Sequence, residues 1–391
     1  MSEVFGRHDF GLSEAEEKRA AHLHESSIII DTLFQGPCGR RSFTSAMVER
    51  LKKQYERHRS AMQAVLDAWS MPFRMALDGE FPPLRETWEA SGITGASRQT
   101  IGFPITPESD PYAQAMEWYS LHQAQFDRFD WLDKALVAED FRVAKRAGKR
   151  VGFLNSQNTL DIGLQLDRLD QFHRFGMRMI QLTYNTVNHV GGGSYDRVDC
   201  GVTNFGSKVI DRMNGLGILV DISHCGRQTT LDACKLSKSP VVASHTAAWG
   251  LFEHVRNKKD DELRAIADTG GYVGIYCLRQ FLTDAKVPSI DAFLDHVDHV
   301  CDVVGWEHVG IGSDWPVQQP EWTDRLFATT MGETGADSRG GFDAPRSLVG
   351  FDDIRDFPNI TRGLVKRGYS DEQIRGILGE NFLRVFEAVC G

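Results

Sequence analysis

Short apolar runs recur along the chain, and longer segments separate them. The runs are rich in Val, Ile and Gly, and most of them end in a polar residue. Nearly continuous apolar runs are typical of strands buried on both faces, and therefore of a parallel sheet. The eight predicted strands are Ser26–Asp31, Ala96–Phe103, Val151–Gln157, Met179–Tyr184, Gly217–His224, Val241–His245, Gly271–Cys277 and His308–Asp314.

Several of the intervening segments carry apolar residues at three- and four-residue spacing. Leu166–Phe175, Val202–Leu216 and Ser289–Val304 have this pattern, which predicts amphipathic helices. Eight alternating strand and helix units indicate an α/β protein with a TIM-like (β/α)8 barrel. We expect residues 1–391 to form a single barrel domain.

One gap is too long for a simple connection between a strand and a helix. The segment of about residues 35–97 contains a helix-like stretch, Ser45–Trp69, followed by a part rich in Pro and Gly. Long insertions in barrels lie mostly in the loops of the catalytic face. We therefore expect this partly helical segment to form a partial cover near the active-site face. A peripheral helical elaboration is the alternative.

Six of the predicted strands end in a polar residue, at the end of the barrel where enzymes of this fold place their active sites. A buried polar group costs about 1–3 kcal/mol unless it is paired. A single histidine at a strand end is more often structural than functional. Two histidines that close successive strands, with an aspartate two strands further on, favour a functional cluster instead. The six residues are Asp31, Gln157, Tyr184, His224, His245 and Asp314.

The two histidines are the candidate metal ligands. Neutral imidazole is the commonest protein ligand of Zn²⁺, and catalytic zinc sites usually add a third histidine or a carboxylate. The available third ligands here are Gln157, whose neutral amide is a weak donor, and Asp314. The sequence therefore predicts a zinc site at His224 and His245 that is weaker than a set of three strong ligands.

Arg256 follows the second histidine by eleven residues. Its planar guanidinium matches a carboxylate, so one interpretation is a clamp on an anionic substrate. The alternative is a surface ion pair with Asp260 or Asp261, which contributes little to stability. Cys225 directly follows His224, and we interpret it as an inert thiol that points away from the site.

Composition narrows the class of protein. Asp+Glu 54 against Lys+Arg 44 gives a net charge of −10, which argues against a nucleic-acid partner. No run of about 18 apolar residues is present, so no membrane span is expected. The seven cysteines are scattered without a CxxC pair, and the first residues lack the apolar region of a signal peptide. We expect a reduced, cytoplasmic protein.

Several ordered blocks also carry a family resemblance. They are QLTYNTVN, GVTNFGSKVIDRMNGLGILVDISHC, SPVVASHTAAWGLFEHVRNKKDDEL, HVGIGSDW and ILGENFLRVF. With these blocks, from about residue 151 to the C-terminus, the chain resembles the renal (membrane) dipeptidase family, peptidase family M19, among the metal-dependent hydrolases. The resemblance implies a TIM-like barrel, a pair of zinc ions, a small-molecule substrate and a homodimer.

The resemblance also implies residue roles. His224 and His245 match the two histidines that hold one metal ion, and Arg256 matches the residue that binds the substrate carboxylate. Asp314 matches the acid beside the catalytic water. Tyr184 stands where the family has a substrate-binding histidine, which makes it a candidate for both substrate binding and catalysis.

The chain departs from the family pattern at the other metal ion. The His-x-Asp pair of the first strand corresponds to Leu33 and Gln35, and the bridging glutamate corresponds to Gln157. Two cations about 3.5–4 Å apart need shared anionic ligands to offset their repulsion. We therefore expect one zinc ion, with Gln157 as a weak ligand or a substrate contact and with the second metal site lost.

Three functions remain open. The first is a metal-dependent, dipeptidase-like hydrolase of a small carboxylated amide or dipeptide. The second is a lyase or isomerase on the same barrel, since Tyr184 and Gln157 replace an imidazole and a carboxylate. The third is a non-catalytic protein that binds a small molecule in the retained pocket.

Overall fold

The computed structural model describes residues 8–34, 36, 43–100, 110–314, 320–333 and 348–391. Within these residues nine strands form one sheet, and every strand pairing is parallel. The strands are β1 (Ile30–Asp31), β2 (Gly95–Thr100), β3 (Leu132–Lys134), β4 (Arg150–Ser156), β5 (Met177–Gln181), β6 (Leu219–Asp221), β7 (Val241–Thr246), β8 (Tyr272–Ile275) and β9 (Val309–Ile311). Eight of them follow the order β1-β2-β4-β5-β6-β7-β8-β9, and β3 pairs with the first residues of β4.

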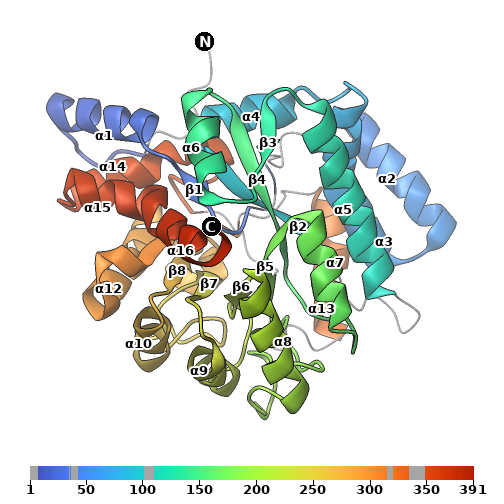
Figure 1. Cartoon of the computed structure of the whole chain (residues 1–391). Helices are drawn as coiled ribbons and strands as arrows, with labels where there is room; N and C mark the ends of the chain where they lie inside the picture. The colour runs from blue at the N-terminus through green and yellow to red at the C-terminus, as the bar shows by residue number, and fades with distance from the viewer. Residues whose placement is uncertain (1–7, 35, 37–42, 101–109, 315–319, 334–347) are drawn as a thin grey trace.

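Hydrogen bonds between the first and last strands close this row into a ring. The amide of Thr32 donates to the carbonyl of Ile311 at 3.0 Å, and the amide of Asp314 donates to the carbonyl of Leu33 at 3.0 Å. The amide of Ser313 donates to the buried carboxylate of Asp31 at 2.8 Å. The ring with its outer helices (Figure 1) confirms the predicted (β/α)8 barrel.

The helices in the described residues are α1 (Glu14–Ser26), α2 (Ser45–His58), α3 (Ala61–Leu77), α4 (Pro83–Ser91), α5 (Pro111–Arg128), α6 (Ala138–Arg146), α7 (Asp167–Phe175), α8 (Asn204–Leu216), α9 (Arg227–Leu236), α10 (Asp260–Asp268), α11 (Arg279–Leu282), α12 (Ile290–Val304), α13 (Glu321–Glu333), α14 (Pro358–Lys366), α15 (Asp371–Arg375) and α16 (Asn381–Cys390). The three helices predicted from apolar spacing correspond to α7, α8 and α12. Two of them begin at a capping side chain: the Thr203 hydroxyl accepts from the amide of Gly206 at α8, and the Ser289 hydroxyl accepts from the amide of Asp291 at α12.

Some predicted boundaries are wrong. The helix-like stretch Ser45–Trp69 is two helices, because Arg59 adopts a left-handed conformation (φ 57°) and ends α2. Only Ile30–Asp31 of the strand predicted at Ser26–Asp31 is strand, since Ser26 ends α1 and residues 27–29 connect the two elements. Most other strands end before their polar residue: β6, for example, ends at Asp221 rather than His224. The end of the strand predicted at Ala96–Phe103 lies outside the described residues.

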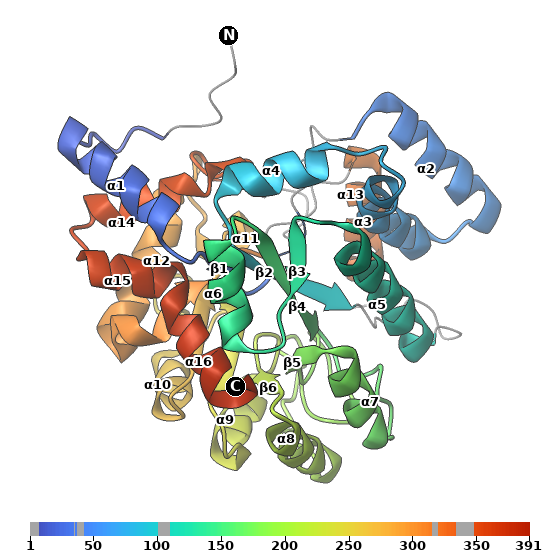
Figure 2. The ribbon, with the colours of Figure 1, turned by 45° about the horizontal axis from the view of Figure 1, so that its top comes forward.

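Segments distant in sequence lie side by side around the barrel. Figures 1 and 2 show α1 beside α14, and α13 beside α3. Helix α3 also contacts the barrel mouth, because its Met62 and Val65 pack against Tyr184, and Leu326 of α13 packs against the same cluster. One helix of the inserted segment, α3, therefore reaches one of the predicted site residues.

The last helix closes the opposite end of the barrel. Phe382 and Phe386 of α16 lie against Phe153 of β4, with ring centroids 5.4 and 5.7 Å away. Phe382 also contacts Tyr272 of β8 at 5.2 Å. These fully buried side chains form an apolar floor to the barrel. Polar groups above this floor are therefore cut off from solvent on that side.

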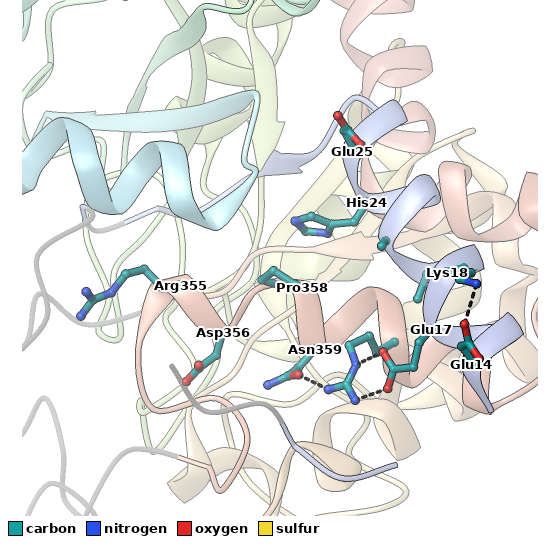
Figure 3. A pocket seen from close by; sticks show the side chains of 12 residues that line it. Glu14, Glu17, Lys18, His24, Glu25, Arg355, Asp356, Pro358 and Asn359 are labelled. Atoms are coloured by element: carbon teal, nitrogen blue, oxygen red, sulfur yellow. Dashed lines mark hydrogen bonds and ion pairs between the residues drawn. The ribbon is translucent and has the colours of Figure 1, made fainter. Parts of the chain in front are cut away.

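A cavity of about 590 Å³ lies between α1 and the start of α14 (Figure 3). Along its wall, Arg362 of α14 pairs with Glu17 of α1 at 2.5 Å. His24 also lines it, with Nδ1 2.8 Å from the Thr361 hydroxyl and Nε2 3.1 Å from the Ser91 carbonyl. Burial lowers the pKa of His24 to about 4, so this histidine is neutral. These contacts join α1 to α4 and α14, which gives the cavity wall a role in helix packing.

Candidate active site

An irregularity in β7 positions His245. The register between β7 and β8 shifts between Ala243 and Thr246, and such bulges re-aim side chains next to active sites. The shift turns the Ser244 carbonyl inward, where the Thr32 hydroxyl donates to it at 2.6 Å. A Cβ at Gly312 would lie 1.7 Å from this carbonyl oxygen, so the close approach of β7 requires glycine there.

A chain of hydrogen bonds fixes the tautomer of His245. Asp221, at the end of β6, accepts the Ser244 hydroxyl at 2.5 Å and the Ser223 hydroxyl at 2.6 Å. Since the Ser244 hydrogen is directed at Asp221, its oxygen accepts from Nδ1–H of His245 at 2.8 Å. Burial raises the pKa of Asp221, and these hydroxyls and two backbone amides oppose that shift. The lone pair of His245 therefore lies on Nε2, on the side of the barrel mouth.

His224 is held by a different partner. It lies in the turn that follows β6, and its Nδ1 is 2.5 Å from the side-chain oxygen of Asn185. An amide oxygen only accepts, so Nδ1 carries the hydrogen and Nε2 carries the lone pair. Asn185 has a φ of 60°, a left-handed conformation that asparagine tolerates better than most residues.

The two imidazoles meet through their Nε2 atoms, which lie 2.8 Å apart. Two lone pairs at this separation repel each other unless a cation or a proton lies between them. Burial, and after it the charge of Arg256, lowers the pKa of both histidines well below the usual value. A shared proton is thereby disfavoured, and the donor chemistry fits a shared metal cation.

Gln157 and Tyr184 complete the immediate surroundings. The side-chain nitrogen of Gln157, one residue beyond β4, lies 3.5 Å from Nε2 of His245. Tyr184 stacks on His224 with a centroid separation of 4.2 Å and an interplanar angle of 22°. The structure thus brings four of the predicted residues into one cluster.

Arg256 is deeply buried, with 1% of its surface exposed. Its Nη1 donates to the carbonyl of Ser223, the residue before His224. Its Nη2 is buried and has no hydrogen-bond partner among the residues that the structure describes. The surface ion pair with Asp260 or Asp261 is therefore wrong: Asp260 faces His299, and Asp261 faces Arg227.

Asp314 lies just beyond β9, at the seam with β1. Burial raises the pKa of Tyr276, the charge of Arg256 acts to lower it, and the negative charge of Asp314 adds to the rise. The guanidinium of Arg256 also lies 5.9 Å from the Tyr276 ring centroid. Tyr276 therefore lies within the electrostatic range of both Asp314 and Arg256.

The residues fit one metal ion better than two. Leu33 is fully buried and offers no ligand atom, and Gln35 lies outside the described residues. Within the described part of the chain, no group of three or more His, Cys, Asp or Glu side chains could hold a metal ion. The available donors are two imidazoles and the neutral amide of Gln157.

Sequence reasoning missed the groups that orient the histidines. Asp221 and Ser244 lie inside apolar runs, and only the register of β6 and β7 shows that they share a face. The signal that was available is spacing, since Asp221 precedes His224 by three residues and Ser244 directly precedes His245. Asn185 follows Tyr184 and carried no separate signal.

Comparisons with known proteins point to the same family that the sequence blocks resemble. The model of the family "Membrane dipeptidase (Peptidase family M19)" matches residues 18–326 and 338–390. Dipeptidase verJ of Clonostachys rogersoniana is 29% identical over 290 residues, which cover 73% of this chain and 68% of that protein. An uncharacterized dipeptidase of Schizosaccharomyces pombe is 32% identical over 269 residues, which cover 66% of this chain and 56% of that protein.

A solved structure, an amidohydrolase from Pseudomonas aeruginosa, superposes with a TM-score of 0.75 and 28% identity. The superposition covers 95% of this chain and 98% of that one.

Proposed function

The chain belongs to the membrane dipeptidase family, peptidase family M19, and on that premise we propose that it hydrolyses a small amide that carries a carboxylate, such as a dipeptide, with one metal ion. The observation that carries the proposal is the convergence of two imidazole lone pairs, each fixed by a partner on its other ring nitrogen. Neutral imidazoles oriented in this way are the usual protein part of a catalytic zinc site.

His224 and His245 would hold the ion, and the side-chain oxygen of Gln157, rather than the nitrogen that lies 3.5 Å from Nε2 of His245, would be the weak third donor. The chemistry that zinc supplies when bound is activation of water and polarisation of the scissile carbonyl. Both ring orientations are set before binding, because Asp221 acts through Ser244 on one histidine and Asn185 acts on the other. Gln157 replaces an anionic bridge by a neutral amide, which supports one ion rather than two.

Arg256 binds the substrate carboxylate in this proposal. Its buried Nη2 supplies hydrogens that no described residue accepts, and a carboxylate oxygen is the strongest acceptor for them. Since Nη1 is anchored on the Ser223 carbonyl, the guanidinium keeps one orientation beside the histidines. The bound carboxylate thereby fixes the distance of the scissile amide from the imidazole pair.

Asp314 accepts the proton of the attacking water at its carboxylate and returns it to the leaving amine. Tyr184 donates a hydrogen bond from its hydroxyl to the substrate, and its ring keeps His224 in place. Gln157 orients the substrate amide through its own amide group. Helix α3 packs against Tyr184 and covers that side of the mouth.

The experiment begins with protein purified without chelators, its metal content and its activity on a dipeptide panel. We expect about one metal ion per chain, and His224→Ala removes both metal and hydrolysis. His299→Ala is the matched control, because this histidine faces Asp260 on the outside of α12. We expect this substitution to leave both metal content and hydrolysis unchanged. Turnover by metal-free wild-type protein, or unchanged activity in His224→Ala, would contradict the proposal.

Tyr184 and Gln157 favour one alternative, an enzyme of the same fold with lyase or isomerase chemistry. A phenol stacked on His224 and an amide beside His245 replace an imidazole and a carboxylate. Product analysis separates the two proposals, since hydrolysis adds one water to the substrate and isomerisation adds none. Substrate binding without any product supports the third function, a non-catalytic binding protein.

The cytoplasmic location, the homodimer and the single domain over residues 1–391 stay predictions. No helix in the described residues is both long and apolar enough to cross a bilayer.

A further inference from the structure

A layer of side-chain amides lies inside the barrel between the apolar floor and the histidines. Gln157 faces the interior, because its side chain reaches Nε2 of His245. Alternate residues of a strand face the same side, so Asn155, two residues earlier on β4, also faces the interior. Phe153, two residues earlier again, contacts Phe382 of the floor.

Strand register places two more amides in this layer. Gln99 of β2 is the register partner of Asn155, and registered residues of parallel strands share a face. Gln181 ends β5, and its side-chain nitrogen donates to the backbone carbonyls of Gln157 and Thr183, both at 2.6 Å. We call Gln99, Asn155 and Gln181 the amide layer.

The amide layer is buried, and its hydrogen-bonding capacity is largely unused. Gln99 is 6% exposed, and the other two residues are fully buried. Both side-chain polar atoms of Gln99, both of Asn155 and the oxygen of Gln181 have no hydrogen-bond partner within the described structure. Buried polar atoms are normally paired, so five such atoms on three adjacent strands indicate that an occupant completes them.

The chemistry of the layer defines that occupant. It offers donors and acceptors together and carries no charge. A charged group buried among three amides would lack a counter-ion, and an apolar group would leave all five atoms unpaired. A carboxamide matches, because it also has two donors and an oxygen acceptor.

We propose that the amide layer is a substrate subsite that binds an uncharged carboxamide, such as the side chain of glutamine, beneath the histidine pair. The role of this site as a substrate subsite rests on the proposed function, although binding of a carboxamide there does not require turnover. Arg256 binds the carboxylate of the same molecule, so Arg256 and the amide layer recognise two different polar groups of one substrate.

The test uses two nearly isosteric dipeptides, Ala-Gln and Ala-Met, with metal-loaded full-length protein. Ligand-induced thermal shift measures binding, and product formation measures hydrolysis. We expect the wild type to bind Ala-Gln at least about tenfold more tightly than Ala-Met. Asn155→Leu and Gln99→Met reduce that preference to about twofold or less, because each replaces an amide with an apolar side chain of similar shape. Gln171→Met, on the outer helix α7, is the matched control and keeps the wild-type preference.

The two proposals fail in different ways. If Ala-Gln binds preferentially and neither dipeptide is hydrolysed, the subsite stands and the hydrolase proposal falls. If the wild type shows no difference in thermal shift between the two dipeptides, the subsite is overturned whether or not either is hydrolysed. The amide layer would then hold ordered water only. A preference that survives both amide substitutions overturns it as well.

Discussion

The two sides of the barrel interior bury polar side chains equally deeply but pair them very differently. On the histidine side, formed by β6 and β7, Asp221 accepts two hydroxyls and two backbone amides. On the amide side, formed by β2, β4 and β5, the side chains of Gln99 and Asn155 have no partner among the described residues. Complete pairing fixes an orientation before a ligand arrives, whereas incomplete pairing leaves the hydrogen bonds for the ligand to make.

The largest expected effect comes from breaking the paired side. Asp221→Asn replaces an acceptor-only group by an amide that also donates, so the Ser244 hydroxyl turns and His245 loses its fixed tautomer. We expect metal affinity and the rate of dipeptide hydrolysis to fall by about 10–100-fold. Metal titration and kcat/KM measure the two losses.

Asp161→Asn is the control for burial alone. Asp161 is also a fully buried aspartate, it accepts from the Ser156 hydroxyl at 2.9 Å, and burial raises its pKa to about 7. Because it does not contact either histidine, this substitution leaves metal affinity unchanged. Equal losses of metal affinity in Asp221→Asn and Asp161→Asn would show that the orientation of the histidines does not depend on Asp221.

A smaller effect is expected at His224. Asn185→Gly removes the acceptor of the Nδ1 hydrogen, and glycine adopts a φ of 60° without strain. Metal affinity should fall by about tenfold, at the lower end of the range for such supporting groups. Calorimetric titration with zinc checks this, and an unaltered affinity would mean that stacking on Tyr184 alone orients the ring.

Tyr184→Phe should have a more modest effect. The ring keeps its stacking on His224 and its packing against α3, and only the hydroxyl is lost. We expect kcat/KM to fall by about fivefold, since one hydrogen bond contributes about 1 kcal/mol. Tyr184→Ala provides the contrast, because it removes the ring as well and should cost far more.

The smallest effect concerns stability and tests the amide side. Gln99→Met removes two unpaired polar atoms, so the ligand-free protein should gain about 1 kcal/mol in the free energy of unfolding. Gln125→Met makes the same change at a buried glutamine that accepts from Arg98 at 2.6 Å, and it should lose about 1–3 kcal/mol. Chemical denaturation of both variants measures the difference, and a loss at Gln99 would show that water already pairs it.

The sequence was informative about the barrel because strands buried on both faces leave unbroken apolar runs. Leu132–Lys134 escaped detection because β3 has only three residues, two of them charged. The two histidines could be predicted to meet, since the ends of parallel strands lie at one rim. The support that Asp221 gives to His245 and the amide layer could not be predicted, because both depend on which residues of neighbouring strands are in register.

The apolar floor made by α16 has a consequence for biosynthesis. This helix leaves the ribosome after every strand of the barrel, so Phe153 and Tyr272 stay uncovered until Phe382 and Phe386 dock against them. Contacts between segments so far apart form slowly, and exposed aromatic clusters promote aggregation in the meantime. Expression yield should therefore respond more strongly to chaperone supply and growth temperature than the stability of the finished protein suggests.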